Sequence, residues 1–237
     1  MTALLTGFRH VERVMGTAVT FDVRSPGAEA AVGAAAGFLH WVDETFSVYR
    51  PGSQISRIGR GDLAVDDALP EVREVRGRCG ELREETDGWF DHEGGSIRGR
   101  ALDPSGYVKG WSIDRAAEFL RFDGAESFCI NAGGDVVAVG RPDGENPWRV
   151  GIRKPGSAAT IATVVAVADA AVATSGVYER GEHIWSGGPR CAERPGSVTI
   201  MGPELGVADA LATAAFAAAD GAPGWLSRFP DYRMVAL

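Results

Sequence analysis

An aspartate and a threonine lie four residues apart in the alanine-rich segment VADALATAAFAAAD, residues 207–220. Alanine strongly favours helix, and positions four apart share one helical face, so the carboxylate of Asp209 and the hydroxyl of Thr213 should face the same way. Hard oxygen donors of this kind suit Mg²⁺, especially together with phosphate oxygens. Two alternatives stay open: Asp209 is a favourable charge at a helix start, and Thr213 bonds back to a carbonyl.

A second segment that could do chemistry is ALDPSGYVKGWSIDRAAEF, residues 101–119. Its Pro-Ser-Gly sequence predicts a turn that leads into a helix starting near Lys109. Free N–H groups and the positive dipole end at a helix start suit phosphate, and Lys109 would add positive charge. An ordinary loop-to-helix junction, with Asp114 in the first turn, explains the same residues.

Two further segments combine polar side chains with glycines or aromatic rings. INAGGDVVAVG predicts two strands joined by a tight turn at Gly133 and Gly134. The glycines would let a ligand or another backbone come close, or they form an ordinary hairpin turn, with Asp135 in a structural role. The segment lacks the GxGxxG spacing of a dinucleotide fingerprint. TDGWFDHEGG places Trp89 beside Phe90. Adjacent aromatic rings suit either a flat ligand or the hydrophobic core.

The elements that must position these residues can be read from the hydrophobic pattern. Short β-branched runs between glycines and prolines predict strands at 17–23, 127–131, 135–140, 148–152, 163–168, 171–175, 183–186, 197–201 and 232–237. Apolar residues at helical spacing predict helices that begin at 25–26, span 69–85 and 110–122, and begin at about 207. The segment 50–61 is predicted to be loop. Strands mixed with helices predict an α+β fold, and we expect one domain, 1–237.

Composition narrows the function classes. The chain carries 24 Lys and Arg against 32 Asp and Glu, a net charge of −8 without a basic run, which argues against nucleic-acid binding. Cys79, Cys129 and Cys191 lack metal-type spacing and predict free thiols in a reducing compartment. The first sixteen residues lack the apolar core of a signal peptide, and the most apolar later run contains Asp169 and is too short to span a bilayer. We therefore expect a cytoplasmic protein without a transmembrane segment, leaving open a leader removed beforehand.

Taken together and in order, these segments resemble the ApbE family, the FAD:protein FMN transferases. The resemblance rests on MGTAVTFDV, FSVYRPGSQISRI, TDGWFD, LDPSGYVKGWSIDRA, INAGGDVVAVG, WRVGI, VATSGVYER, HI and ADALATA. It implies a single ApbE-type, T-fold-like domain with mixed or antiparallel sheets and flanking helices. It also implies that, with Mg²⁺, FAD is cleaved at its pyrophosphate, AMP leaves, and FMN is joined to a Thr or Ser hydroxyl of an acceptor protein that carries a short flavinylation motif.

The resemblance also assigns roles to individual residues. The residues expected to contact FAD are Met15, Tyr49, Trp89, Phe90, Asp91, Ser105, Trp111 and Ile184. The ligands expected for Mg²⁺ are the backbone carbonyl of Val108 and the side chains of Asp209 and Thr213, with Ala212 close by. Lys109 would help to neutralise the phosphates, and His183 is the candidate base for the acceptor hydroxyl.

Two segments depart from the family pattern. Family members usually read His-Ile-x-Asp-Pro-x-Thr-Gly, whereas this chain reads HIWSGGPR, without the Asp, Pro and Thr. The segment 92–101 is short and lacks the Pro-Leu turn that is common at this place. The FAD and metal motifs are therefore better preserved than the acceptor motif. Two alternatives follow: a Mg²⁺-dependent FAD pyrophosphatase that yields FMN and AMP, and an FAD-binding protein without catalysis.

Overall fold

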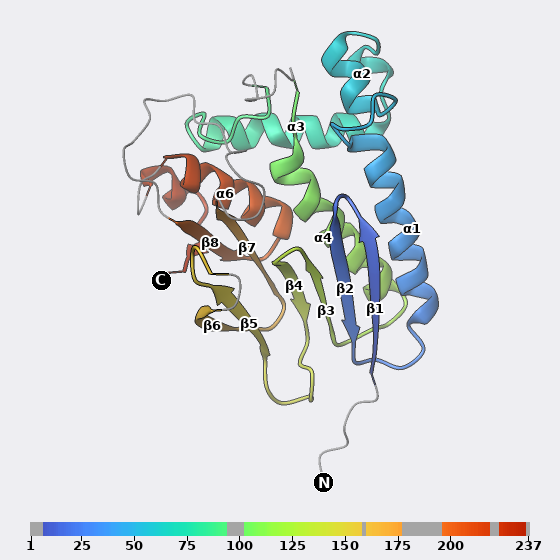
Figure 1. Ribbon diagram of the computed structural model, residues 1–237, viewed down its shortest axis with the longest axis vertical. Helices are drawn as coiled ribbons and strands as arrows, with labels where there is room; N and C mark the ends of the chain where they lie inside the picture. The colour runs from blue at the N-terminus through green and yellow to red at the C-terminus, as the bar shows by residue number, and fades with distance from the viewer. Residues whose placement is uncertain (1–6, 94–101, 158–159, 177–195, 219–222, 236–237) are drawn as a thin grey trace.

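The computed structural model describes residues 7–93, 102–157, 160–176, 196–218 and 223–235. In this part of the chain, helices pack along an antiparallel sheet, and a two-stranded ribbon lies beside it (Figure 1). The α+β class predicted from the sequence is confirmed.

The main sheet collects strands from both halves of the described chain. Its order is β1-β2-β3-β4-β7-β8-β9, and all neighbours run antiparallel. The strands are β1 Phe8–Val14, β2 Thr17–Val23, β3 Phe128–Ala132, β4 Asp135–Val139, β7 Ala170–Gly176, β8 Ser197–Gly202 and β9 Arg233–Met234. A separate ribbon pairs β5 Trp148–Arg153 with β6 Ile161–Val167. Because β2 pairs with β3, the early hairpin and the later strands share one sheet.

The helices provide the second layer. They are α1 Glu29–Phe46, α2 Gln54–Arg60, α3 Pro70–Glu85, α4 Ser105–Phe122 and α6 Leu205–Ala218, with short 3₁₀ turns at Val65–Asp67 and Gly224–Arg228. Helix α4 lies between α1 and α6, and in the view of Figure 1 α3 lies across the top of this layer, above α6. None of the helices in the described ranges has both the length and the apolar character that crossing a membrane requires.

Strand β4 separates two apolar layers. Val137 and Val139 belong to the large core that includes the helices, whereas Val136 and Ala138 pack in a smaller cluster with Trp148 of β5. Successive side chains of a strand point to opposite faces. The β5–β6 ribbon therefore covers the face of β4 that the helices leave open.

The structure corrects the sequence reading at several places. The segment 50–61, predicted as loop, contains α2, which Ser53 caps by accepting a hydrogen bond from the Ser56 N–H at 3.0 Å. Helix α4 begins four residues before Lys109, and α6 begins two residues before Val207. Strand β1 was not predicted, because its mixed charged and apolar residues become a strand only through pairing with β2. The strand expected at 183–186 lies outside the described residues.

Candidate active site

The tip of the β1–β2 hairpin forms one side of the site. Met15 and Gly16 both have positive φ, 53° and 71°, as the favoured two-residue hairpin turn requires. A non-glycine residue in this region is uncommon. Here the conformation directs Met15 toward α4, where its Sδ lies 3.7 Å from the hydroxyl of Ser112.

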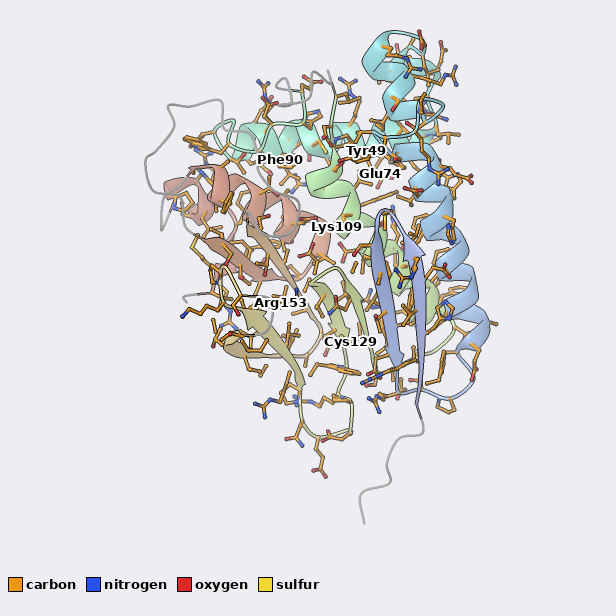
Figure 2. All side chains as sticks on the ribbon, viewed as in Figure 1. Tyr49, Glu74, Phe90, Lys109, Cys129 and Arg153 are labelled. Carbon is orange, nitrogen blue, oxygen red and sulfur yellow. The ribbon has the colours of Figure 1, made fainter. Side chains whose placement is uncertain are left out.

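A cavity of about 450 Å³ opens between this hairpin, the end of α1 and the start of α4. Its lining includes five residues that the family resemblance assigned to FAD, the metal or the phosphates: Met15, Tyr49, Ser105, Val108 and Lys109. Tyr49 and Lys109 are labelled in Figure 2, and the side chain of Tyr49 is 61% exposed. Apolar wall residues such as Phe46 lie beside the Asp43–Arg50 ion pair, whose atoms are 2.6 Å apart. The cavity thus offers both apolar and charged contacts to one ligand.

Lys109 connects this cavity with two buried carboxylates. Its ammonium is ion-paired with Asp135, and it lies 3.7 Å from Oδ2 of Asp209. Asp135 is 1% exposed and Asp209 3% exposed. Oδ1 of Asp135 also accepts a hydrogen bond from the Thr174 N–H at 2.9 Å. A buried carboxylate is costly without a charged or hydrogen-bonding partner, so the ammonium of Lys109 stabilises the charge of Asp135.

Asp209 and Thr213 share one face of α6, with one helical turn between them. Asp209 is the fifth residue of the helix, and the first turn contains no acidic residue, so a simple charge at the helix start does not describe it. The Thr213 hydroxyl is hydrogen-bonded to the hydroxyl of Ser175 on β7 at 3.2 Å. A Cβ atom at Gly106 would lie 3.3 Å from both Oγ1 of Thr213 and Cε2 of Phe90. The start of α4 therefore lies directly against Thr213.

The residues expected to bind a metal carry oxygen atoms of the kind that a hard divalent cation prefers. Asp209 offers a carboxylate, Thr213 a hydroxyl, and Val108 a backbone carbonyl from the cavity wall. Across the described ranges, no three His, Cys, Asp or Glu side chains gather into a group that could hold a metal. The proposed ligand set therefore combines the carboxylate of Asp209 with neutral oxygen atoms. Such a set suits Mg²⁺, which commonly keeps water and substrate phosphate oxygens as its other ligands.

Asp114 joins the two helices that carry these groups. It lies in the third turn of α4, not in the first as the sequence predicted, and it accepts hydrogen bonds from the N–H groups of Leu205 at 3.0 Å and Gly206 at 2.8 Å. Such amides at a helix start have no acceptor within their own helix. Burial raises the pKa of Asp114 to about 6, although the two amides act in the opposite direction. A Cβ atom at Gly110 would lie 2.5 Å from the Leu205 carbonyl oxygen, so this close approach of the helices needs glycine.

Four predicted FAD contacts lie outside the lining of this cavity: Trp89, Phe90, Asp91 and Trp111. Trp111 is buried against Phe46, with ring centroids 5.3 Å apart, and so supports the cavity wall from behind. Asp91 is ion-paired with Arg83 at 3.2 Å. Phe90, labelled in Figure 2, lies beside Gly106 at the start of α4, on which Thr213 also borders.

His183 and Ile184 lie outside the described residues. Ala212 is fully buried in α6 beside Thr213. The turn predicted at Gly133–Gly134 joins β3 and β4. Sequence reasoning left Asp135 in a structural role and missed its ion pair. The signal that could have found it was a carboxylate directly after that turn, at the start of an apolar strand.

The sequence is similar to a protein-family model and to individual curated proteins. The ApbE family model matches residues 95–235. A FAD:protein FMN transferase of Vibrio cholerae serotype O1 is 32% identical over 123 residues, which cover 47% of this chain and 37% of the relative. A FAD:protein FMN transferase of Treponema pallidum is 35% identical over 138 residues, covering 50% of this chain and 38% of the relative. The matches therefore span less than two fifths of these relatives' own length.

Solved structures are similar over nearly the whole chain. A mutant of the flavin transferase ApbE from Vibrio cholerae superposes with a TM-score of 0.78 at 20% identity, covering 98% of this chain and 97% of that one. The ApbE protein of Thermotoga maritima gives a TM-score of 0.77 at 23% identity, covering 97% and 93%. At these identities the likeness establishes the fold.

Proposed function

The chain belongs to the ApbE family, and on this premise we propose that it transfers FMN from FAD to a Ser or Thr hydroxyl of an acceptor protein and releases AMP. One observation carries the proposal. Lys109 faces the buried carboxylates of Asp135 and Asp209 from a cavity that Met15 and Tyr49 also line. Residues far apart in the sequence thus meet at one place with the charges that phosphoryl transfer uses.

The proposed reaction displaces one phosphate by an alcohol. The acceptor hydroxyl oxygen attacks the phosphorus of the FMN half, and a phosphoester bond forms. The bond from that phosphorus to the bridging oxygen breaks, and AMP leaves with the oxygen and the electron pair. The hydroxyl proton passes to a base. Catalysis of such a step consists mainly of holding the groups in line and neutralising negative charge.

The cavity supplies groups for both tasks. Lys109 would bring an ammonium to the pyrophosphate. Ser105 lines the same cavity at the start of α4, where its own N–H is donated to Oδ1 of Asp103 at 3.1 Å. The exposed ring of Tyr49 and the apolar wall at Phe46 suit the flat isoalloxazine ring. Met15 would close the cavity from the β1–β2 turn.

Asp209, Thr213 and the carbonyl of Val108 would hold Mg²⁺. The ion, when bound there, supplies positive charge that polarises the phosphate oxygens. His183, outside the described residues, is proposed as the base because it matches the histidine of the family's His-Ile motif. The acceptor protein is proposed to carry a short flavinylation motif with a Ser or Thr.

A second candidate function is hydrolysis of FAD to FMN and AMP, with water in place of the acceptor hydroxyl. The observation that favours it is the segment HIWSGGPR, which lacks the Asp, Pro and Thr usual in the family's acceptor motif. The same cavity would hold FAD in both reactions. A non-catalytic FAD-binding protein is the outcome in which neither reaction occurs.

We also propose a single domain, 1–237, since the main sheet takes strands from Phe8 to Met234. The cytoplasmic location remains a prediction from the sequence.

Mass spectrometry of an acceptor tests the proposed reaction. The protein is incubated with FAD, Mg²⁺ and a peptide that contains a Ser/Thr-Gly-Ala/Ser-Thr sequence, and the peptide is analysed after denaturation. Transfer predicts that the peptide gains FMN through a phosphoester, with one AMP released for each peptide modified. AMP with free FMN and an unmodified peptide would instead establish the hydrolase, and retention of intact FAD would contradict both reactions.

A further inference from the structure

We propose that Asp135 is a positioning residue, which holds the ammonium of Lys109 in the cavity beside Asp209. The proposal rests on the function proposed above and adds to it a residue outside the family-derived set. Asp135 reaches the reaction only through Lys109, with which it is ion-paired.

Asp135 is itself held firmly. It is the first residue of β4, directly after the turn from β3, and it is 1% exposed. Its Oδ1 accepts the Thr174 N–H of β7 at 2.9 Å, so the other oxygen has a fixed direction toward α4. A carboxylate that two neighbouring strands hold in place can fix the position of a flexible lysine side chain through an ion pair.

The side chain of Lys109 needs a fixed partner of this kind to hold its ammonium in one position. A lysine side chain is a flexible four-carbon stem with a point charge, and it lacks the rigid fork of arginine. Among the 24 Lys and Arg of this chain, the two lysines are Lys109 and Lys154. The side chain of Lys109 is 17% exposed, and its ammonium lies 3.7 Å from Oδ2 of Asp209. The contact with Asp135 therefore holds the ammonium of Lys109, a cavity-lining residue, close to the buried carboxylate of Asp209.

The negative charge of Asp135 distinguishes a role in positioning Lys109 from a role in attracting FAD. Asp135 is negative and cannot itself attract the anionic pyrophosphate. Its removal would leave the site more positive, so the affinity for FAD should stay the same or rise. A displaced ammonium would nevertheless stabilise the transition state less well, because small misplacements of catalytic groups are costly. The signature of positioning is a fall in kcat without a loss of FAD affinity.

Asp135→Asn is the central variant. The asparagine oxygen can still accept the Thr174 N–H, whereas its amide N–H₂ replaces the charge that faces Lys109. Asp22→Asn is the matched control. Asp22 is also ion-paired on the main sheet, to Arg24 at 2.7 Å. It pairs in register with Cys129 and lines a separate cavity with it. Cys129 lies well apart from Lys109 in Figure 2.

The measurements are AMP release from FAD, FAD affinity by flavin fluorescence, and the melting temperature. We expect Asp135→Asn to lose about 10–100-fold in kcat, with the FAD Kd unchanged or lower and the melting temperature close to that of the wild type. Lys109→Met should lose at least as much in kcat, and the double variant should lose no more than Lys109→Met alone. Asp22→Asn should keep both constants within about twofold.

A second readout does not depend on activity. A lysine amine that is held protonated in an ion pair reacts slowly with acylating reagents, because acylation requires the lone pair of the neutral amine. Peptide mass spectrometry can follow acylation of Lys109 with the exposed Lys154 as the internal reference. In the absence of FAD and Mg²⁺, Asp135→Asn should raise the Lys109/Lys154 labelling ratio several-fold, and Asp22→Asn should leave it unchanged.

Three results would overturn the proposal. The first is wild-type kcat or an unchanged labelling ratio in Asp135→Asn. The second is a double variant whose loss equals the product of the single losses. The third is unfolding of both Asp135→Asn and the charge-conserving Asp135→Glu below the assay temperature, which would assign Asp135 to the fold. A wild-type protein that releases no AMP would instead refute the proposed function. The Lys109/Lys154 labelling ratio would still test whether Asp135 holds Lys109 in an ion pair.

Discussion

At the scale of single residues, the proposed metal site depends on the positions of one carboxylate, that of Asp209, and one hydroxyl, that of Thr213. The buried carboxylate of Asp209 lies 3.7 Å from the ammonium of Lys109, and Thr213 is hydrogen-bonded to Ser175 on β7. Both α6 residues lie one helical turn apart on a nearly fully buried helix. Their oxygens therefore have little freedom, which suits a metal that demands regular geometry.

Removal of the Asp209 charge should abolish the metal-dependent reaction. We expect Asp209→Asn to lower Mg²⁺-dependent AMP release by about 100-fold or more, since the charge stabilisation that a bound metal provides is worth several kcal/mol. Chromatography of AMP, with and without a chelator, measures the effect, and circular dichroism checks the fold. A folded variant with wild-type Mg²⁺-dependent activity would contradict the metal assignment.

Thr213 allows a comparison that separates shape from chemistry. Thr213→Val keeps the branched shape and removes the hydroxyl, whereas Thr213→Ser keeps the hydroxyl. We expect the Mg²⁺ concentration for half-maximal AMP release to rise about 10-fold in the valine variant, and to change little in the serine variant. Equal effects of the two substitutions would show that packing, and not the oxygen, matters at this position.

At the scale of secondary-structure elements, the pairing of α4 with α6 positions the site. Lys109 and Val108 belong to α4, whereas Asp209 and Thr213 belong to α6. Gly110 permits the close contact with the Leu205 carbonyl, and Asp114 accepts the first amides of α6. The distance between Lys109 and the proposed metal ligands Asp209 and Thr213 is thus set by contacts between helices.

Gly110→Ala should push these helices apart. The added Cβ would approach the Leu205 carbonyl oxygen to 2.5 Å, and overpacking of this kind typically costs about 1–3 kcal/mol of the unfolding free energy. Gly37→Ala in α1 is the matched control, because its Cβ would meet no atom within 4 Å and should stabilise the helix by about 0.5–1 kcal/mol. Denaturant unfolding measures both, and opposite signs are expected. A neutral Gly110→Ala would contradict the close packing.

The pH dependence of Asp114 gives a test with a defined sign. Its pKa is raised to about 6 from the usual 3.8, so the folded protein binds this proton more tightly than the unfolded chain. Stability from this group is therefore full below pH 3.8 and is lost as the pH rises through about 6. The unfolding free energy of the wild type, minus that of Asp114→Asn, should increase when the pH falls from 7.5 to about 4.5. A difference that shrinks on acidification would contradict the raised pKa.

At the scale of the whole molecule, sequence patterns predicted individual helices and strands better than they predicted which elements contact one another. The β-branched run of β2 and the apolar stripe of α1 indicated their elements, because both patterns depend on neighbouring residues. The partnership of β1 with β2, and the Asp114 contact with α6, depend on residues brought together by the tertiary fold.

The same division holds for the candidate site. Ordered motifs identified Met15, Tyr49, Ser105, Val108 and Lys109, which share the cavity. Asp135 was not predicted as a site residue, because its ion pair joins it to Lys109 on a different element, α4. Its burial also cannot be read from the sequence. The sequence thus predicted the residues that line the cavity, whereas the structure revealed Asp135, the counter-ion of Lys109.

A crystal structure of the protein with FAD and Mg²⁺ tests the central claim most directly. The account predicts FAD in the cavity between Met15 and Tyr49, with its pyrophosphate at the Lys109 ammonium and Mg²⁺ bound by Asp209 and Thr213. FAD bound elsewhere, for example in the separate cavity lined by Arg24 and Trp148, with Asp209 distant from both metal and phosphate, would contradict it.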